Sequence, residues 1–178
     1  VRPVLRKLAA EWKGNTLVEH VYAAFSEDVH TARKALLFSV SLEKNAVGHN
    51  IPDFPMLLSR GLADIKDSYT EKLTTVDRND PEQRKKAEFW EAACIVIDAA
   101  VAFSRRHSQL AAEMAEKEED PVRRQELLEL SRITAKVPEF PAESFHEAIQ
   151  SVYFTHTVHM IESNAYSMSY GRLDQYLY

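Results

Sequence analysis

The feature that most constrains the fold is a helix-start signal that recurs along this chain of 178 residues. The signal is an aspartate followed by a proline, at Asp80-Pro81 and again at Asp120-Pro121. The aspartate side chain can accept from the free backbone N–H groups at the start of a helix, and the fixed φ of the proline suits the first turn. Asp53 with Pro55 gives the same signal. With only 4 glycines, the chain also lacks the tight turns of an all-β fold. We therefore expect a mainly α structure.

Capping residues and apolar spacing place the individual helices. The expected helices run from about Pro3 to Trp12, from Asn15 or Thr16 through Phe25, from Ser26 onwards, from Asp53 through Tyr69, from Pro81 to about Glu118, from Pro121 to about Lys136, and from a Ser144/Glu147 capping box to Ser163. The helix after Ser26 should turn four apolar residues inward: Ala32, Leu36, Leu37 and Val40. Residues Ala92–Ile97 are apolar on nearly every helix face, which predicts a position at the centre of the core. Val137–Pro141 should form a rigid connector.

Charge and cysteine content exclude several classes of protein. The formal net charge of −5 is spread along the chain in both signs, which gives no basis for binding nucleic acid or an anionic membrane surface. The single cysteine excludes an internal disulfide framework and favours a reducing cytoplasm. The longest apolar run, Ala92–Phe103, contains Asp98 and is too short to span a bilayer. We expect a cytoplasmic protein with no nucleic-acid or membrane partner.

His49 is a candidate for acid–base chemistry. It lies in a Gly-His-Asn loop that Pro52 follows, and an imidazole titrates close to pH 7. The structural alternative is a loop histidine that bonds to the backbone. Residue type alone leaves both interpretations open.

Two patterns contain residue types that bind metals. His156, His159 and Glu162 follow one another at intervals of three, but this row rotates by about 60° per step on a helix, so the third side chain faces away from the first. The pairs Glu27/His30 and Glu143/His146 have the Glu-x-x-His spacing of di-iron bundles. Each of these glutamates falls at a helix start rather than in mid-helix. We expect packed or surface histidines and no metal site, with a metal-binding helical bundle as an alternative.

The last segment, residues 162–178, leaves the helical pattern and alternates small, polar and aromatic residues. It reads Glu-Ser-Asn-Ala-Tyr-Ser-Met-Ser-Tyr-Gly-Arg-Leu-Asp-Gln-Tyr-Leu-Tyr. This segment closely resembles the motif E-S-N-G-H-S-x-S-x-G-R-x-D-Q-Y-L-Y of glycyl radical enzymes, the pyruvate formate-lyase-like family, and in particular its glycerol and diol dehydratase branch. Upstream, Gly48-His49, Pro52-Asp53 and the run Leu57–Leu62 are similar to that branch's GHxxPDxxxxLxxGL segment. Two helical stretches, 110–128 and 137–148, agree in order, so the resemblance covers essentially the whole chain.

The resemblance implies that residues 1–178 are an N-terminal fragment of a pyruvate formate-lyase domain. The helical region would be 1–163, and 164–178 would begin a ten-stranded α/β barrel, with its first strand near 165–169. The lack of an initiator Met and the abrupt end at Tyr178 also indicate a piece of a longer protein.

The resemblance further implies an oxygen-sensitive, anaerobic enzyme. In this family a glycyl radical near the C-terminus oxidises a loop cysteine to a thiyl radical, which abstracts hydrogen from the substrate. A separate S-adenosylmethionine-dependent iron–sulfur activating enzyme installs the radical, and the full-length protein is expected to be a homodimer. Cys94 follows Ala93 inside a helix rather than standing in a Gly-Cys loop, and none of the 4 glycines stands in the R-[VI]-x-G-[YF] setting of the radical residue. We therefore expect no catalytic residue and no cofactor in this chain, and no activity of the chain alone.

The family motif carries over two positions that contact substrate hydroxyls in the dehydratase branch, His49 and Ser167. Tyr166 stands where that branch has a histidine, and we count it as a third substrate-binding candidate. A phenol titrates far above an imidazole, which speaks against glycerol or propanediol as substrate. Another alcohol or amine dehydratase or lyase, or an aryl-acid decarboxylase, fits the change. Arg172 and Asp174 are expected to form an ion pair in the scaffold.

Three readings of the function therefore stay open. The first is part of a lyase or dehydratase that acts on a small hydroxylated or related substrate. The second is a formate C-acetyltransferase-type or decarboxylase member of the same family. The third, from a different class, is a non-catalytic helical interaction module that kept the scaffold and lost the chemistry.

Overall fold

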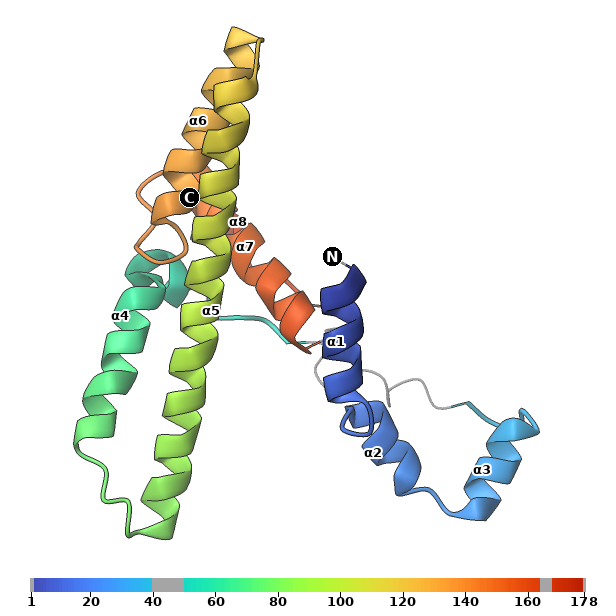
Figure 1. Ribbon diagram of the computed structural model, residues 1–178. Coiled ribbons are helices and arrows are strands. Elements are labelled where there is room, and N and C mark those ends of the chain that lie inside the picture. Colours follow the sequence, from blue (N-terminus) through green and yellow to red (C-terminus); the bar gives the residue numbers. More distant parts are fainter. Residues whose placement is uncertain (1, 40–49, 164–167, 178) are drawn as a thin grey trace. The chain divides into compact units, whose positions relative to one another are not determined.

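The computed structural model describes residues 2–39, 50–163 and 168–177 (Figure 1). Eight helices and no strand occur among these residues, so the predicted mainly α structure is confirmed. Of the first barrel strand predicted near residues 165–169, residues 165–167 lie outside the described part, and Met168 and Ser169 are not in a strand. The contacts divide the chain into two compact units, residues 1–50 with 160–168 and residues 51–159 with 169–178.

The first unit contains the helices α1 (Arg2–Trp12), α2 (Leu17–Ala23) and α3 (Glu27–Lys34). The predicted cap of α2 is confirmed: Glu19 N donates to Thr16 Oγ1 at 3.3 Å, and Thr16 N donates to Glu19 Oε2 at 3.0 Å. The prediction that Leu36 and Leu37 point inward is wrong. The helix ends at Lys34, and Leu36, with a left-handed φ of 58°, is 89% exposed. The left-handed residue breaks the helical spacing on which the prediction rested.

The second unit contains α4 (Phe54–Thr74), α5 (Pro81–Lys117), α6 (Pro121–Lys136), most of α7 (Phe145–Ser163) and α8 (Leu173–Tyr176). All three predicted aspartate caps are confirmed. Their carboxylates accept from Met56 N at 3.0 Å, Glu82 N at 2.9 Å and Val122 N at 2.9 Å. The predicted ends of α5 and α6 also agree with the structure within one residue.

Helix α5 is the long axis of this unit, with α4 beside one half of it and α6 beside the other (Figure 1). Small residues make the α5–α6 contact close: Ala111 and Ala115 are buried, and the single O–H of Ser104 is shared between the carbonyls of Thr134, at 2.6 Å, and Val137, at 2.7 Å. The expected core position of Ala92–Ile97 is wrong for this chain. Ile97 is buried, but Ile95 is 70% exposed, because α4 covers one face of that half of α5 and leaves the face of Ile95 uncovered by the described residues.

The connector at residues 137–142 is held against α4. Leu62 N donates to Pro138 O, and Ala142 N donates to Leu58 O. Gly61 interrupts α4 with a φ of 73°, and a Cβ at this position would lie 2.6 Å from Glu139 O. The connector thus approaches the helix so closely that only glycine fits. Within the described ranges, no helix is both long enough and apolar enough to cross a membrane.

Candidate functional site

The three predicted substrate-binding residues, His49, Tyr166 and Ser167, lie outside the described residues. Their roles therefore stay predictions. The segments that follow them in sequence are described, from residue 50 onwards and from residue 168 onwards, and both belong to the part of the motif that resembled the dehydratase branch.

The start of α4 is the anchor for both segments. Asp53 caps the helix, and Phe54, its first residue, is fully buried. Phe54 belongs to a core cluster with four other buried residues: Leu57, Leu58, Ala148 and Val152. Residues of the terminal segment pack against this cluster: Leu173, Tyr176 and Leu177. The core therefore joins α4, α7 and α8.

Aromatic rings extend this core towards α7. The ring of Tyr170 stacks on Phe54 with centroids 6.1 Å apart, and the ring of His156 lies 4.9 Å from Tyr170. The ring of Tyr176 lies 6.5 Å from Phe54. Such pairs contribute beyond the apolar area that they bury. Tyr170 is thereby held between the start of α4 and the middle of α7.

Gly171 forms a tight turn between these two tyrosines. Its φ of 63° is left-handed, and a Cβ there would overlap Tyr176 Oη and lie 2.8 Å from Ile51 Cγ2. The backbone N–H of Arg172 donates to Tyr176 Oη at 2.7 Å, which closes the turn. The chain that enters α4 and the chain that enters α8 therefore touch at this glycine.

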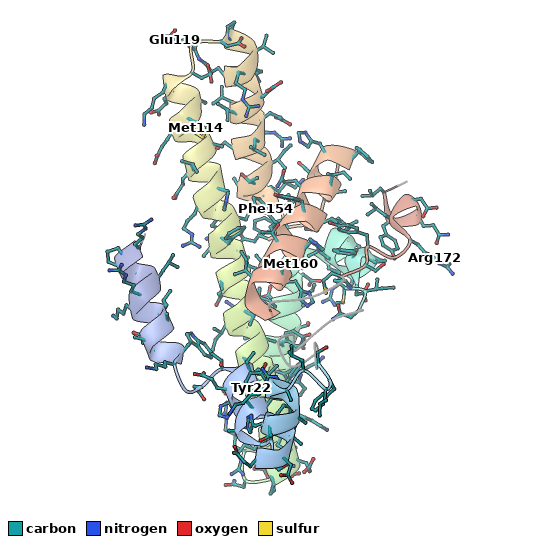
Figure 2. The ribbon with its side chains drawn as sticks, turned by 90° about the vertical axis from the view of Figure 1, so that its right-hand side faces the viewer. Tyr22, Met114, Glu119, Phe154, Met160 and Arg172 are labelled. Carbon is teal, nitrogen blue, oxygen red and sulfur yellow. The ribbon has the colours of Figure 1, made fainter. Side chains whose placement is uncertain are left out.

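The expected ion pair between Arg172 and Asp174 is absent, although both residues are described. Arg172 Nη1 instead lies 3.5 Å from Gln175 Oε1. Figure 2 shows Arg172 in the turn before α8, where it is exposed. Residues two apart on a short helix point in different directions, so a local Arg-x-Asp pair is not favoured there.

His156 and Thr155 each carry a buried polar atom that is unpaired among the described residues. His156 Nδ1 and Thr155 Oγ1 have no hydrogen-bond partner within the described part of the chain. By contrast, His107 Nδ1 bonds to Phe103 O at 2.9 Å, and Thr157 Oγ1 donates to Tyr153 O at 2.8 Å. A buried unpaired polar atom costs about 1–3 kcal/mol, so this side of α7 is suited to a polar partner.

Glu147 is a buried carboxylate paired with two cations near the start of α7. Its side chain is 4% exposed and accepts from Lys136 Nζ at 2.8 Å, from Arg132 Nη1 at 3.3 Å and from the backbone N–H of Glu143 at 2.8 Å. Burial raises the pKa of Glu147, but the bonds from Lys136, Glu143 N–H and Arg132 outweigh it and leave this pKa below its ordinary value. One arm of the predicted capping box is confirmed, since Glu147 N donates to Ser144 Oγ at 3.2 Å. The return arm goes to Glu143 N–H rather than to the cap residue.

One member of each Glu-x-x-His pair makes a structural contact. Glu143 accepts from Lys136 Nζ at 2.6 Å, and His30 Nε2 bonds to Tyr22 O at 3.0 Å. Across the described ranges, no group of three or more His, Cys, Asp or Glu side chains gathers as a metal site would require. The side chain of Glu162 lies outside those ranges.

A pocket of about 430 Å³ lies between the end of α4 and the start of α5, beside Thr75 and Trp90, and two further surface pockets of the second unit also lie away from the Gly171 turn. One, of about 630 Å³, lies by the start of α6 and includes His146. The other, of about 310 Å³, lies between α5, α6 and α7, where Phe154 packs edge-on against Phe103 at 5.6 Å (Figure 2). None of these pockets is lined by the motif segments, so we place the candidate site at the Gly171 turn. Its residues Phe54, Tyr170 and Tyr176 were missed from sequence, although a glycine followed by a tyrosine five residues later is a visible signal.

Comparison with known proteins identifies the family to which this chain belongs. The sequence model of the family described as "Pyruvate formate lyase-like" matches residues 1–178. Isethionate sulfite-lyase from Nitratidesulfovibrio vulgaris is 36% identical over 188 aligned residues, which cover 99% of this chain and 23% of that protein.

Two solved structures superpose on this chain with a TM-score of 0.85. One, from a study of 1,2-propanediol dehydration in Roseburia inulinivorans, is 39% identical, and the match covers 95% of this chain and 21% of that chain. The other, the glycerol-bound B12-independent glycerol dehydratase from Clostridium butyricum, is 33% identical, and the match covers 98% of this chain and 22% of that chain. The chain thus spans less than a quarter of the length of each of these relatives. On the match over its whole length, the chain belongs to the pyruvate formate lyase-like family of glycyl radical enzymes.

Proposed function

We propose that this chain is the N-terminal part of a longer glycyl radical enzyme that acts as a lyase or dehydratase on a small hydroxylated substrate. In this proposal residues 1–163 are its helical region and residues 164–178 begin its barrel. The observation that carries the proposal is the match to the family over residues 1–178. The relatives are named for isethionate, 1,2-propanediol and glycerol, all small molecules that carry a hydroxyl group.

The residues of this chain would bind and orient the substrate. His49 and Ser167 would hydrogen-bond to its hydroxyl groups in a cavity closed to water. A hydroxyl left unpaired there would cost about 1–3 kcal/mol, which gives the pocket its selectivity. Tyr166, with a phenol whose ordinary pKa is about 10, would act as a neutral hydrogen-bond donor at pH 7 rather than as an acid–base group. We therefore expect a preferred substrate other than glycerol or propanediol.

The remaining machinery would lie on other residues of the longer protein. A glycyl radical would supply hydrogen abstraction through a thiyl radical, and an S-adenosylmethionine-dependent iron–sulfur enzyme would install it. We further propose an anaerobic, cytoplasmic, homodimeric enzyme. No activity is expected from residues 1–178 alone.

The test is anaerobic expression of the full-length reading frame together with its activating enzyme. Electron paramagnetic resonance measures the glycyl radical, and assays measure sulfite release from isethionate and water loss from 1,2-propanediol and glycerol. We expect a radical signal, with turnover of isethionate or of a further hydroxylated compound above that of the two polyols. A chain comprising residues 1–178 serves as the inactive control.

Two outcomes would contradict the proposal. A full-length protein that never acquires a radical under these conditions would favour the non-catalytic helical module. A protein that carries the radical but cleaves only pyruvate or decarboxylates aryl acids would belong to the acyltransferase or decarboxylase type instead.

A further inference from the structure

We propose that Ile51, Gly171 and Tyr176 form a clamp, here called the Tyr176 clamp, that positions the chain on either side of it for substrate binding. These are positioning residues, and none of them is assigned to contact the substrate. The inference rests on the proposed function in one respect, the assignment of His49 and Ser167 to the substrate. The contacts of the clamp itself do not depend on that assignment.

The clamp joins two segments that are far apart in sequence. Ile51 follows His49 by two residues, and Gly171 follows Ser167 by four. Ile51 Cγ2 would lie only 2.8 Å from a Cβ on Gly171, so the side chain of Ile51 packs directly on the backbone of Gly171. Because one residue spans at most about 3.6 Å of chain, both segments leave the clamp within a few residues of the proposed substrate-binding positions.

Tyr176 fixes the geometry of the clamp through both its hydroxyl and its ring. The hydroxyl oxygen accepts from Arg172 N–H at 2.7 Å and occupies the space beside Gly171. The ring packs 6.5 Å from Phe54, which is fully buried at the start of α4. The turn is thereby attached to a rigid helix rather than left as a free loop. Functional groups held by such support keep the geometry that binding needs.

A purely structural role would look different from a positioning role. If the clamp only contributed to the core, its loss would loosen the whole second unit, including the α5–α6 pair, and would leave substrate affinity unchanged in the protein that remains folded. If the clamp positions the two segments, its loss acts locally and raises the Michaelis constant. Hydrogen exchange and kinetics measure these two consequences separately.

The experiment uses the full-length protein with Tyr176→Phe, which removes only the hydroxyl, and with Ile51→Ala. Ile51→Val retains both branches at Cβ and is the conservative rescue. Tyr153→Phe is the matched control, because Tyr153 lies on α7 in the same unit and is 59% exposed. Hydrogen exchange followed by mass spectrometry is read in peptides that cover residues 44–52 and 162–172, and in peptides from α5 and α6.

We expect Tyr176→Phe and Ile51→Ala to speed exchange about fivefold in both motif peptides, the change that follows the loss of one hydrogen bond or a comparable contact. Exchange in α5 and α6 should stay as in the parent, and Ile51→Val and Tyr153→Phe should behave like the parent. With the hydroxylated substrate that the parent turns over, the Michaelis constant should rise several-fold while the radical yield is unchanged.

Unchanged exchange in either motif peptide, or faster exchange throughout α5 and α6, would overturn the clamp. Local loosening with an unchanged Michaelis constant would also overturn its positioning role. If the parent turns over no substrate, the proposed function fails, yet the exchange measurement still decides whether the clamp exists.

Discussion

Replacing Gly61 by alanine should strongly destabilise the second unit. The residue adopts φ 73° and ψ 165°, a conformation almost confined to glycine, which costs other residues about 1–3 kcal/mol. A Cβ there would also lie 2.6 Å from Glu139 O and 2.6 Å from the carbonyl carbon of Phe140. Both neighbours are backbone atoms, so no side chain can rotate away to make room.

The connector must therefore move, and three backbone hydrogen bonds depend on its place. Leu62 N and Ala63 N each donate to it at 2.9 Å, and Ala142 N donates back to Leu58 O at 3.0 Å. Each bond contributes about 0.5–1.5 kcal/mol. Together with the backbone cost, we expect a loss of about 3–6 kcal/mol, a large fraction of the total stability of an ordinary domain.

Urea unfolding followed by the fluorescence of Trp90 measures this loss, because Trp90 lies on α5 in the same unit. A Trp12→Phe background removes the other tryptophan. Gly14→Ala is the matched control: Gly14 has a φ of 84° but nothing within 4 Å of its would-be Cβ, and it lies in the first unit. We expect it to leave the Trp90 transition in place. If Gly61→Ala shifts that transition no more than Gly14→Ala does, the close approach of the connector is refuted.

Three further predictions follow from the contacts. Ser104→Ala should lower the free energy of unfolding in urea by about 1–2 kcal/mol, because Thr134 O, one of the last carbonyls of α6, loses its donor. Ser68→Ala should be close to neutral, because the hydroxyl of Ser68 bonds to Ile65 O within its own helix. Because the pKa of Glu147 is lowered in the folded state, this carboxylate stabilises the fold above pH 4.5, and the stabilisation is lost as the pH falls through the folded-state pKa. Acid unfolding measures this loss, and Glu147→Gln should make the free energy of unfolding less dependent on pH below 4.5. Ser167→Ala in the full-length enzyme should raise the Michaelis constant or lower turnover while the radical signal is unchanged, and identical kinetics would remove Ser167 from the pocket.

The helix starts could be predicted from sequence because they are local. Asp80 needs only the backbone N–H groups of the next residues as partners, and Thr16 finds its partner Glu19 three residues away. Leu36 and Leu37 were placed wrongly because periodicity alone does not show where a helix ends. One arm of the Ser144/Glu147 box failed, because the Glu147 carboxylate accepts from the N–H of Glu143 at 2.8 Å instead of from that of Ser144.

The candidate site was only partly predictable. The motif located the two segments, but the contact of Ile51 with the Gly171 turn joins residues 120 positions apart, and no local rule anticipates it. The role of Tyr176 depends in the same way on Phe54, which lies on another helix. The expected Arg172–Asp174 pair failed for the converse reason, since closeness in sequence was taken for closeness in space.

The exposed apolar face of α5 gives the failed core prediction a physical meaning. A helix that is apolar on nearly every face is normally buried on every face, yet Ile95 is 70% exposed and Val96 is 46% exposed. A sequence pattern reflects burial in the whole protein that carries it, whereas these exposures reflect burial by the described residues alone. Because the chain spans less than a quarter of its relatives' length, most of the surface that could cover this face in such a protein lies beyond the present sequence. The mismatch therefore supports the proposal that these helices pack against a larger enzyme, and the same face should become protected from hydrogen exchange when the full-length protein is compared with residues 1–178.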